Sequence, residues 1–180
     1  MELFATLNKQ LADYDAEIWE PLVHLSRYAY LKQAHEKDTH IYFIEKGGMR
    51  IFIETPEEDI TYRLGYAGNV FGDLQGFISD TPTAYCIQAL RQTVLKPVRR
   101  ERFLAFLEAD EKHKSLWFDL LNSVILQQGE RERDLLTGSP TERYRRVLAR
   151  SPQLFQEIPL KYIASYLRMS PETLSRIRNS

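Results

Sequence analysis

Residues 71–86, FGDLQGFISDTPTAYC, set two glycines and Asp73 among apolar side chains and then turn at Thr-Pro-Thr. Gly72 and Gly76 leave the backbone free to turn, so that its N–H groups can face an anion. Asp73 adds a side chain that accepts hydrogen bonds. The segment has no Lys or Arg to pair with a phosphate. The segment therefore indicates a pocket that binds a phosphate or another molecule. The alternative is that it has only a structural role and binds no ligand.

A second group of functional residues lies near the C-terminus, in IPLKYIASYLRMSPETLSRIRNS. Its spacing predicts a helix over residues 160–167 and another that starts near Pro171, with Ser170 as N-cap. The inward face is apolar: Ile163, Ala164, Leu167, Leu174 and Ile177. The outward face is polar and partly basic: Ser170, Glu172, Thr173, Ser175, Arg176 and Arg178.

These outward side chains are suited to a DNA major groove. Arg binds guanine bidentately, Glu accepts a hydrogen bond from cytosine, and Ser or Thr holds phosphates. The pattern therefore predicts a helix-turn-helix that reads DNA. A helical hairpin without DNA binding is the alternative.

Charge is distributed unevenly along the chain of 180 residues. Residues 138–180 contain eight Lys or Arg against three Glu, a net charge of +5, so the other 137 residues carry −6 within the total of −1. A basic segment on an acidic body favours a module that binds a polyanion, with a solvated basic face as the alternative.

Several other classes of protein lack the residues they need. Cys86 is the single cysteine, so it forms no intramolecular disulfide and cannot alone hold an iron–sulfur cluster or structural zinc. The four histidines (His24, His35, His40 and His113) include no His-x-His pair, and no nucleophile with a base partner is evident. We expect neither a metal site nor an enzyme. No apolar run is long enough to span a bilayer and no signal peptide is evident, so we expect a cytoplasmic protein without a membrane partner.

The hydrophobic period changes along the chain and predicts an α+β fold. Residues 2–25 have the spacing of two short helices, the second capped by Asp15. Residues 26–98 are short β-type runs broken by turns, which favour an antiparallel sandwich or roll. Helical spacing returns over 101–136, and TGSP at 137–140 marks a boundary. We predict a β-roll over 1–111, a long helix over 112–137 and a helical domain over 138–180.

The long helix contains a row of residues at coiled-coil spacing: Trp117, Leu121, Val124 and Gln128. This row predicts a dimer interface. Docking of the helix on its own domain is the alternative. A second apolar row of Leu116, Leu120, Phe118 and Ile125 leaves room for both.

The order of β-roll, long helix and helix-turn-helix resembles the Crp/Fnr family of bacterial transcription regulators. The stretch IYFIEKGGMRIFIETPEEDITYRLGYAGNVFGDLQGF is similar to the effector-domain strands of that family, and MSPETLSRIR to its recognition helix. The resemblance implies base contacts by Ser170, Glu172 and Arg176. It also implies a homodimer on a pseudo-palindromic operator in double-stranded DNA, with RNA polymerase as a further partner.

In this family, the segment equivalent to 71–86 holds the phosphate of a cyclic nucleotide. Gly72, Asp73 and Leu74 match the family's Gly-Glu-Leu, but its Arg-Ser pair falls on Thr83 and Ala84. Losing that buried charged pair costs about 2–5 kcal/mol of binding energy. We therefore do not expect cAMP to be the effector. A smaller or more apolar ligand, or none, fits better, and no cofactor is required.

Other residues bear on this ligand site. Arg63 or Arg91 swinging in from a neighbouring strand is an alternative source of positive charge for a phosphate. Gln128 on the long helix matches the region that closes the family's pocket across the dimer, and a solvated helix position is its alternative.

Two features depart from the family pattern. Arg168 stands in the turn between the two C-terminal helices, where the family usually places Gly, so we expect a strained or adjusted turn. The sequence stops at Ser180 without a β-wing and resembles the short, wingless regulators common in the Bacteroidetes, for which we expect weaker and less salt-dependent DNA binding. A dimeric or ligand-sensing module that has lost DNA binding is the alternative function.

Overall fold

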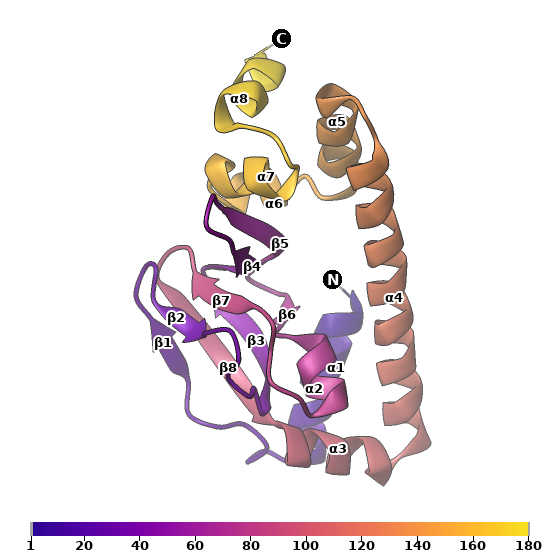
Figure 1. Ribbon diagram of the computed structural model, residues 1–180. Coiled ribbons are helices and arrows are strands. Elements are labelled where there is room, and N and C mark those ends of the chain that lie inside the picture. The colour runs from indigo at the N-terminus through magenta and orange to yellow at the C-terminus, as the bar shows by residue number, and fades with distance from the viewer. Residues whose placement is uncertain (1, 180) are drawn as a thin grey trace.

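The computed structural model describes residues 2–179 and shows a β-roll and a C-terminal group of helices joined by one long helix (Figure 1). The strands are β1 (Val23–Leu25), β2 (Tyr30–Lys32), β3 (His40–Lys46), β4 (Gly48–Glu54), β5 (Asp59–Tyr66), β6 (Val70–Phe71), β7 (Cys86–Ala89) and β8 (Thr93–Arg99). The helices are α1 (Glu2–Tyr14), α2 (Leu74–Ser79), α3 (Arg100–Ala109), α4 (Glu111–Leu136), α5 (Pro140–Arg150), α6 (Leu154–Glu157), α7 (Leu160–Tyr166) and α8 (Pro171–Asn179).

The roll consists of two antiparallel sheets, with the strand orders β1-β8-β3-β6 and β2-β7-β4-β5. Their facing side chains form one apolar core that includes Ile44, Ile51 and Leu95. The β3–β4 turn needs Gly47, because its φ is +103° and a Cβ there would lie 2.4 Å from Oγ1 of Thr93. The predicted antiparallel roll is therefore confirmed.

The N-terminal segment contains one helix, so the prediction of two helices over 2–25 is wrong. After α1 ends at Tyr14, Asp15 caps only a turn by accepting from the backbone N–H of Glu17 at 2.8 Å. Trp19 then forms a backbone bridge with Val98, and Pro21 follows, which cannot donate a helical hydrogen bond. Pairing with a distant strand thus prevails over local helical spacing.

The long helix α4 forms within one residue of the predicted bounds. It starts where the Asp110 side chain accepts from the backbone N–H of Lys112 at 2.8 Å. Its inner face buries Leu116, Leu120 and Val124 in a core shared with α1 and α3. None of the helices within residues 2–179 is long and apolar enough to cross a membrane.

The last two helices pack on a core shared with α5 and α6. Leu174 is fully buried there, together with Ile163, Ala164 and Leu167 of the α7 segment. Between α7 and α8, Arg168 has φ +53°, a left-handed conformation that costs about 1–2 kcal/mol for a residue with a Cβ. Arg143 offsets part of that cost, because its Nη2 donates to the Arg168 carbonyl at 3.3 Å.

Candidate ligand cavity and nucleic-acid interface

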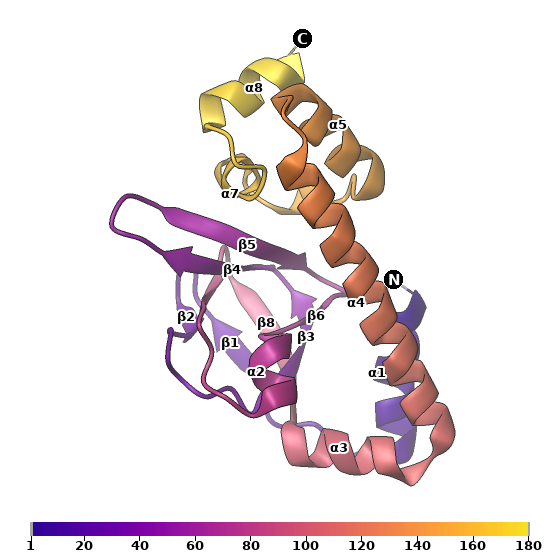
Figure 2. The same ribbon diagram turned by 45° about the vertical axis from the view of Figure 1, so that its right-hand side comes forward.

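A cavity of about 960 Å³ lies where the roll, α4 and the C-terminal helices meet. Figure 2 shows α4 running past β5 and β6 on its way to α5. The cavity's walls come from β5, β6, the start of α2, the inner face of α4 and the α5–α6 connection. Segments far apart in the sequence therefore share one space.

Gly72, Asp73 and Leu74 line the roll end of this cavity. Asp73 is the N-cap of α2: its Oδ1 accepts from the backbone N–H of Gln75 at 3.1 Å, and the residue is 7% exposed. The carboxylate thus occupies the place at the helix start that an anion would need. A second negative charge there would be repelled.

Thr83 and Ala84 do not line the cavity. The Thr83 side chain is buried in its own turn, where Oγ1 accepts from the backbone N–H of Tyr85 at 3.1 Å. Its own N–H donates to the Glu36 carbonyl at 2.9 Å, while Ala84 is exposed. The structure therefore brings Gly72, Asp73 and Leu74 to one space and leaves Thr83 and Ala84 outside it.

Sequence reasoning missed Tyr62, which lies against Tyr85 of this segment. The rings of Tyr62 and Tyr85 stack with centroids 4.9 Å apart and planes inclined by 4°. Burial raises the pKa of the Tyr85 hydroxyl, and nearby Tyr62 and Asp73 raise it further. This stacked pair places aromatic surface beside the glycine segment.

A β-bulge explains why Tyr62 was not assigned to the site. In β5, Thr61 pairs with Phe52 and Arg63 with Ile51, so Tyr62 is the extra residue. The cavity is therefore lined by three consecutive residues of β5: Tyr62, Arg63 and Leu64. In a regular strand, where successive side chains point to opposite faces, Arg63 would point away from it. The only sequence signal was the polar-aromatic run ITYRLGY.

The far end of the cavity lies beside the C-terminal helices. Gln128, Arg131 and Leu135 of α4 line it together with Tyr166 of α7. The Arg131 guanidinium lies over the Tyr166 ring, with Cζ 3.7 Å from the centroid. Burial lowers the pKa of Arg131. Gln128 thus lies at the cavity, and Arg131 adds a cation that the sequence did not point to.

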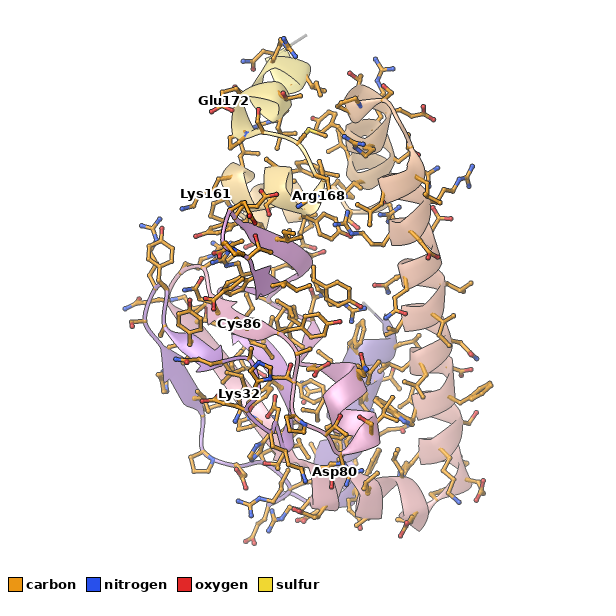
Figure 3. All side chains as sticks on the ribbon, viewed as in Figure 1. Lys32, Asp80, Cys86, Lys161, Arg168 and Glu172 are labelled. Atoms are coloured by element: carbon orange, nitrogen blue, oxygen red, sulfur yellow. The ribbon has the colours of Figure 1, made fainter. Side chains whose placement is uncertain are left out.

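Helix α8 presents most of the predicted DNA-reading side chains to solvent. Ser170 caps the helix by accepting from the backbone N–H of Thr173 at 3.2 Å. Glu172, Ser175, Arg176 and Arg178 are exposed, and Figure 3 shows Glu172 on the outer side of α8. Hydrogen bonds from its own backbone N–H and from Ser170 lower the pKa of Glu172.

The residues predicted as a dimer seam on α4 occupy different environments. Val124 is buried in the chain's own core, Trp117 and Leu121 are half-buried, and Gln128 is exposed. Phe118 and Ile125, one residue further along than Trp117 and Val124, are each 63% exposed. The predicted row thus packs partly on its own domain. In the second row, two residues are buried, Leu116 and Leu120, and two are exposed, Phe118 and Ile125.

Within residues 2–179, no group of three or more His, Cys, Asp or Glu side chains is placed to hold a metal ion.

Comparison with known proteins identifies the roll. The family model of the cyclic nucleotide-binding domain matches residues 22–110, the part of the chain that contains the roll. No curated protein matches the sequence. The chain resembles solved structures of the Crp/Fnr family of regulators.

Three solved structures illustrate the likeness. The catabolite activator protein of Thermus thermophilus is 21% identical with a TM-score of 0.60, over 99% of this chain and 85% of that one. FixK2 of Bradyrhizobium japonicum is 16% identical with a TM-score of 0.73, over 88% and 82%. The sensor domain of the transcriptional regulator DNR from Pseudomonas aeruginosa is 20% identical with a TM-score of 0.56, over 77% and 99%. At these identities, the likeness establishes the fold.

Proposed function

We propose that the protein is a DNA-binding transcription regulator of the Crp/Fnr type that acts as a dimer. The observation that carries the proposal is α8, a capped helix whose buried Leu174 faces the core while Glu172, Arg176 and Arg178 are exposed. The net charge of +5 over residues 138–180 supports it, because positive charge attracts the phosphate backbone of DNA.

The exposed side chains of α8 would make two kinds of contact with DNA, some to base edges and others to phosphates. Arg176 lies four residues after Glu172, so the two share one helix face, where Arg176 would contact guanine and Glu172 cytosine. Ser170 would contact a base as well, while Thr173, Ser175 and Arg178 would hold phosphates. The Ser170 hydroxyl donates to Oγ1 of Thr173 at 3.2 Å, so it orients the Thr173 hydroxyl, which would donate to a phosphate of the DNA backbone.

A second copy of the chain is needed to bind both halves of a pseudo-palindromic site. Two recognition helices must lie about 34 Å apart to meet successive major grooves of a pseudo-palindrome. The exposed apolar residues on α4, above all Phe118 and Ile125, fit a helix-to-helix contact between two copies. We therefore place the centre of the dimer interface on this exposed row, next to the row predicted from the sequence.

We infer that the roll does not use cAMP as its effector. The carboxylate of Asp73 already caps α2, and Thr83 and Ala84 supply no cation where the nucleotide phosphate would lie. Isothermal titration with cAMP tests this inference, and submillimolar binding at the roll would contradict it.

The test of DNA binding is fluorescence anisotropy with DNA from upstream of the protein's own coding sequence, titrated with salt. We expect binding that weakens as salt is added, with the shallower salt dependence expected for a reader that makes fewer phosphate contacts. Arg176→Ala should lose about 1–3 kcal/mol of preference for the specific site over scrambled DNA. Arg178→Ala, as the matched control on the same helix, should weaken binding to both DNAs alike.

Failure at low salt by a folded dimer would overturn the regulator function and favour a dimeric sensing module. An Arg176→Ala variant that keeps its sequence preference would show that α8 does not read bases.

A further inference from the structure

The end of the cavity beside α7 contains a guanidinium group, that of Arg131, which forms no ion pair with a carboxylate among residues 2–179. Nη1 of Arg131 is buried and has no hydrogen-bond partner among residues 2–179. Two nearby carboxylates on α4, the preceding Glu130 and Asp134 about one turn later, pair instead with Arg146 and Arg150 of α5. Arg131 is thus a half-buried cation with one buried N–H group that lacks an acceptor.

A buried charged donor without an acceptor is unfavourable, so its persistence needs an explanation. Tyr166 supports the guanidinium from one side, because its ring lies 3.7 Å from Cζ. That contact uses the face of the guanidinium and leaves the N–H groups of Nη1 without an acceptor. An Arg remains charged even when buried, and its planar edge matches a carboxylate or phosphate.

A second cation and an apolar wall complete this end of the cavity. Arg63 of β5 lines the same space and is half-buried. The apolar wall includes Val70, Leu135, Val147 and Leu154. The volume of about 960 Å³ is within the range of small-molecule sites.

We propose that this end of the cavity binds a small organic anion, with its carboxylate or phosphate on Arg131 and Arg63 and its body against the apolar wall. The site is distinct from the Thr83–Ala84 turn, which lies outside the cavity. Its residues come from three bodies: β5 of the roll, α4, and α7 of the C-terminal helices.

The site also gives a ligand a way to act on the proposed DNA reader. A molecule that contacts β5, α4 and α7 together favours the arrangement in which all three surround it. This regulatory role rests on the proposed function, whereas the binding site itself does not.

The test is isothermal titration of the full chain with three probes: 4-phenylbutyrate, phenyl phosphate and 4-phenylbutan-1-ol. We expect at least one anion to bind, and the uncharged alcohol to bind at least about tenfold more weakly. Arg131→Gln should weaken anion binding by at least about tenfold, while Arg133→Gln, an exposed arginine on the same helix, should leave it unchanged.

The proposal is wrong if neither anion binds, if the alcohol binds as tightly as 4-phenylbutyrate, or if Arg133→Gln weakens binding as much as Arg131→Gln. Thermal unfolding of each variant checks that it is folded. Where Arg131→Gln does not fold, Arg63→Gln replaces it, with the same expected loss.

DNA anisotropy with the same variants separates this site from the proposed function. Anion binding that depends on Arg131, in a protein that binds no DNA, would support the site and overturn the regulator function. DNA binding without anion binding would do the reverse.

Discussion

At the scale of single residues, Asp38 is a carboxyl buried with one unsatisfied oxygen. It is 3% exposed; Oδ1 accepts from the Tyr42 hydroxyl at 3.0 Å and the His40 N–H at 3.2 Å. Oδ2 is buried without a hydrogen-bond partner in residues 2–179, and Lys32 Nζ lies 4.0 Å from Oδ1. Burial raises the pKa of Asp38 above its ordinary value of 3.8, although Lys32 and Tyr42 oppose that shift.

This raised pKa predicts a particular pH dependence of stability. The folded state holds the Asp38 proton more tightly than the unfolded state, so its contribution to stability is lost as pH rises from the ordinary value through the raised pKa. Asp38→Asn removes the titration, and the variant should therefore gain stability relative to the wild type across that window. Urea unfolding from about pH 4 to about pH 7 measures the difference.

Asp80→Asn is the matched control. Lys37 donates to the Asp80 carboxylate and lowers its pKa, so Asp80 stabilises the fold above its ordinary pKa and loses that contribution as pH falls. Asp80 therefore titrates below this window, and the stability difference between this variant and the wild type should stay nearly constant from about pH 4 to about pH 7. A pH-independent difference between Asp38→Asn and the wild type would contradict the prediction.

At the scale of elements, one buried carboxylate joins α4 to α5. Asp134 is fully buried and accepts from Arg146 Nε at 2.8 Å and from Arg150. Glu130, one turn earlier, also pairs with Arg146, at 2.7 Å. This ion group fixes the angle at which the C-terminal helices leave the long helix.

Removing Asp134 should therefore loosen that junction. Asp134→Ala leaves two partly buried arginines short of a partner, and we expect a loss of about 3 kcal/mol in the free energy of unfolding. Glu132→Ala, an exposed acid on the same helix, should change it by less than about 0.5 kcal/mol. Urea unfolding monitored by circular dichroism measures both. Equal small losses would show that the ion group is not structurally important.

The elements that the sequence predicted well have local signals at their ends. The start of α4 is marked by Asp110, whose carboxylate caps that helix. The start of α8 is marked by Ser170 before Pro171, and the Ser170 hydroxyl caps that helix. The second N-terminal helix was wrong because Trp19 instead pairs with Val98, a partner that local periodicity does not reveal.

The candidate site divides in the same way. The motif match predicted that Gly72, Asp73 and Leu74 line the site, and they do line the cavity. The match succeeded because these three residues are contiguous and lie at one turn. Tyr62 depends on a bulge opposite Phe52, and Arg131 on the meeting of α4 with α7. Neither relation leaves a signal in the spacing of residues along the chain.

At the scale of the whole molecule, the proposed dimer depends on exposed apolar surface of α4. Ile125→Glu would place a charge in that interface and remove about 2 kcal/mol of apolar burial per chain, so the dimer dissociation constant should rise at least ~100-fold. Ile78→Glu on α2, 54% exposed in the wild type, should leave the dimer intact. Sedimentation equilibrium measures both variants, and an unchanged Ile125→Glu dimer would place the interface elsewhere.

The C-terminal helices are also docked on the edge of the roll. Oγ of Ser165 in α7 accepts from the Thr61 N–H at 3.0 Å and donates to the Asp59 carbonyl at 3.1 Å. Both partners belong to β5, the edge strand of its sheet. An ion pair between Arg168 and Glu58 at 3.1 Å lies beside this contact. The serine thus satisfies backbone groups that an edge strand otherwise exposes.

Ser165→Ala should loosen this docking without unfolding either part. The Thr61 N–H loses its acceptor, a change of about 1–2 kcal/mol, so its hydrogen exchange should accelerate by about tenfold. Ser175→Ala, an exposed serine on α8, is the control and should leave Thr61 unchanged. Exchange followed by NMR on both variants decides the matter: if Thr61 is equally protected in Ser165→Ala, contacts other than this serine hold α7 against β5, and the docking is not controlled at that residue.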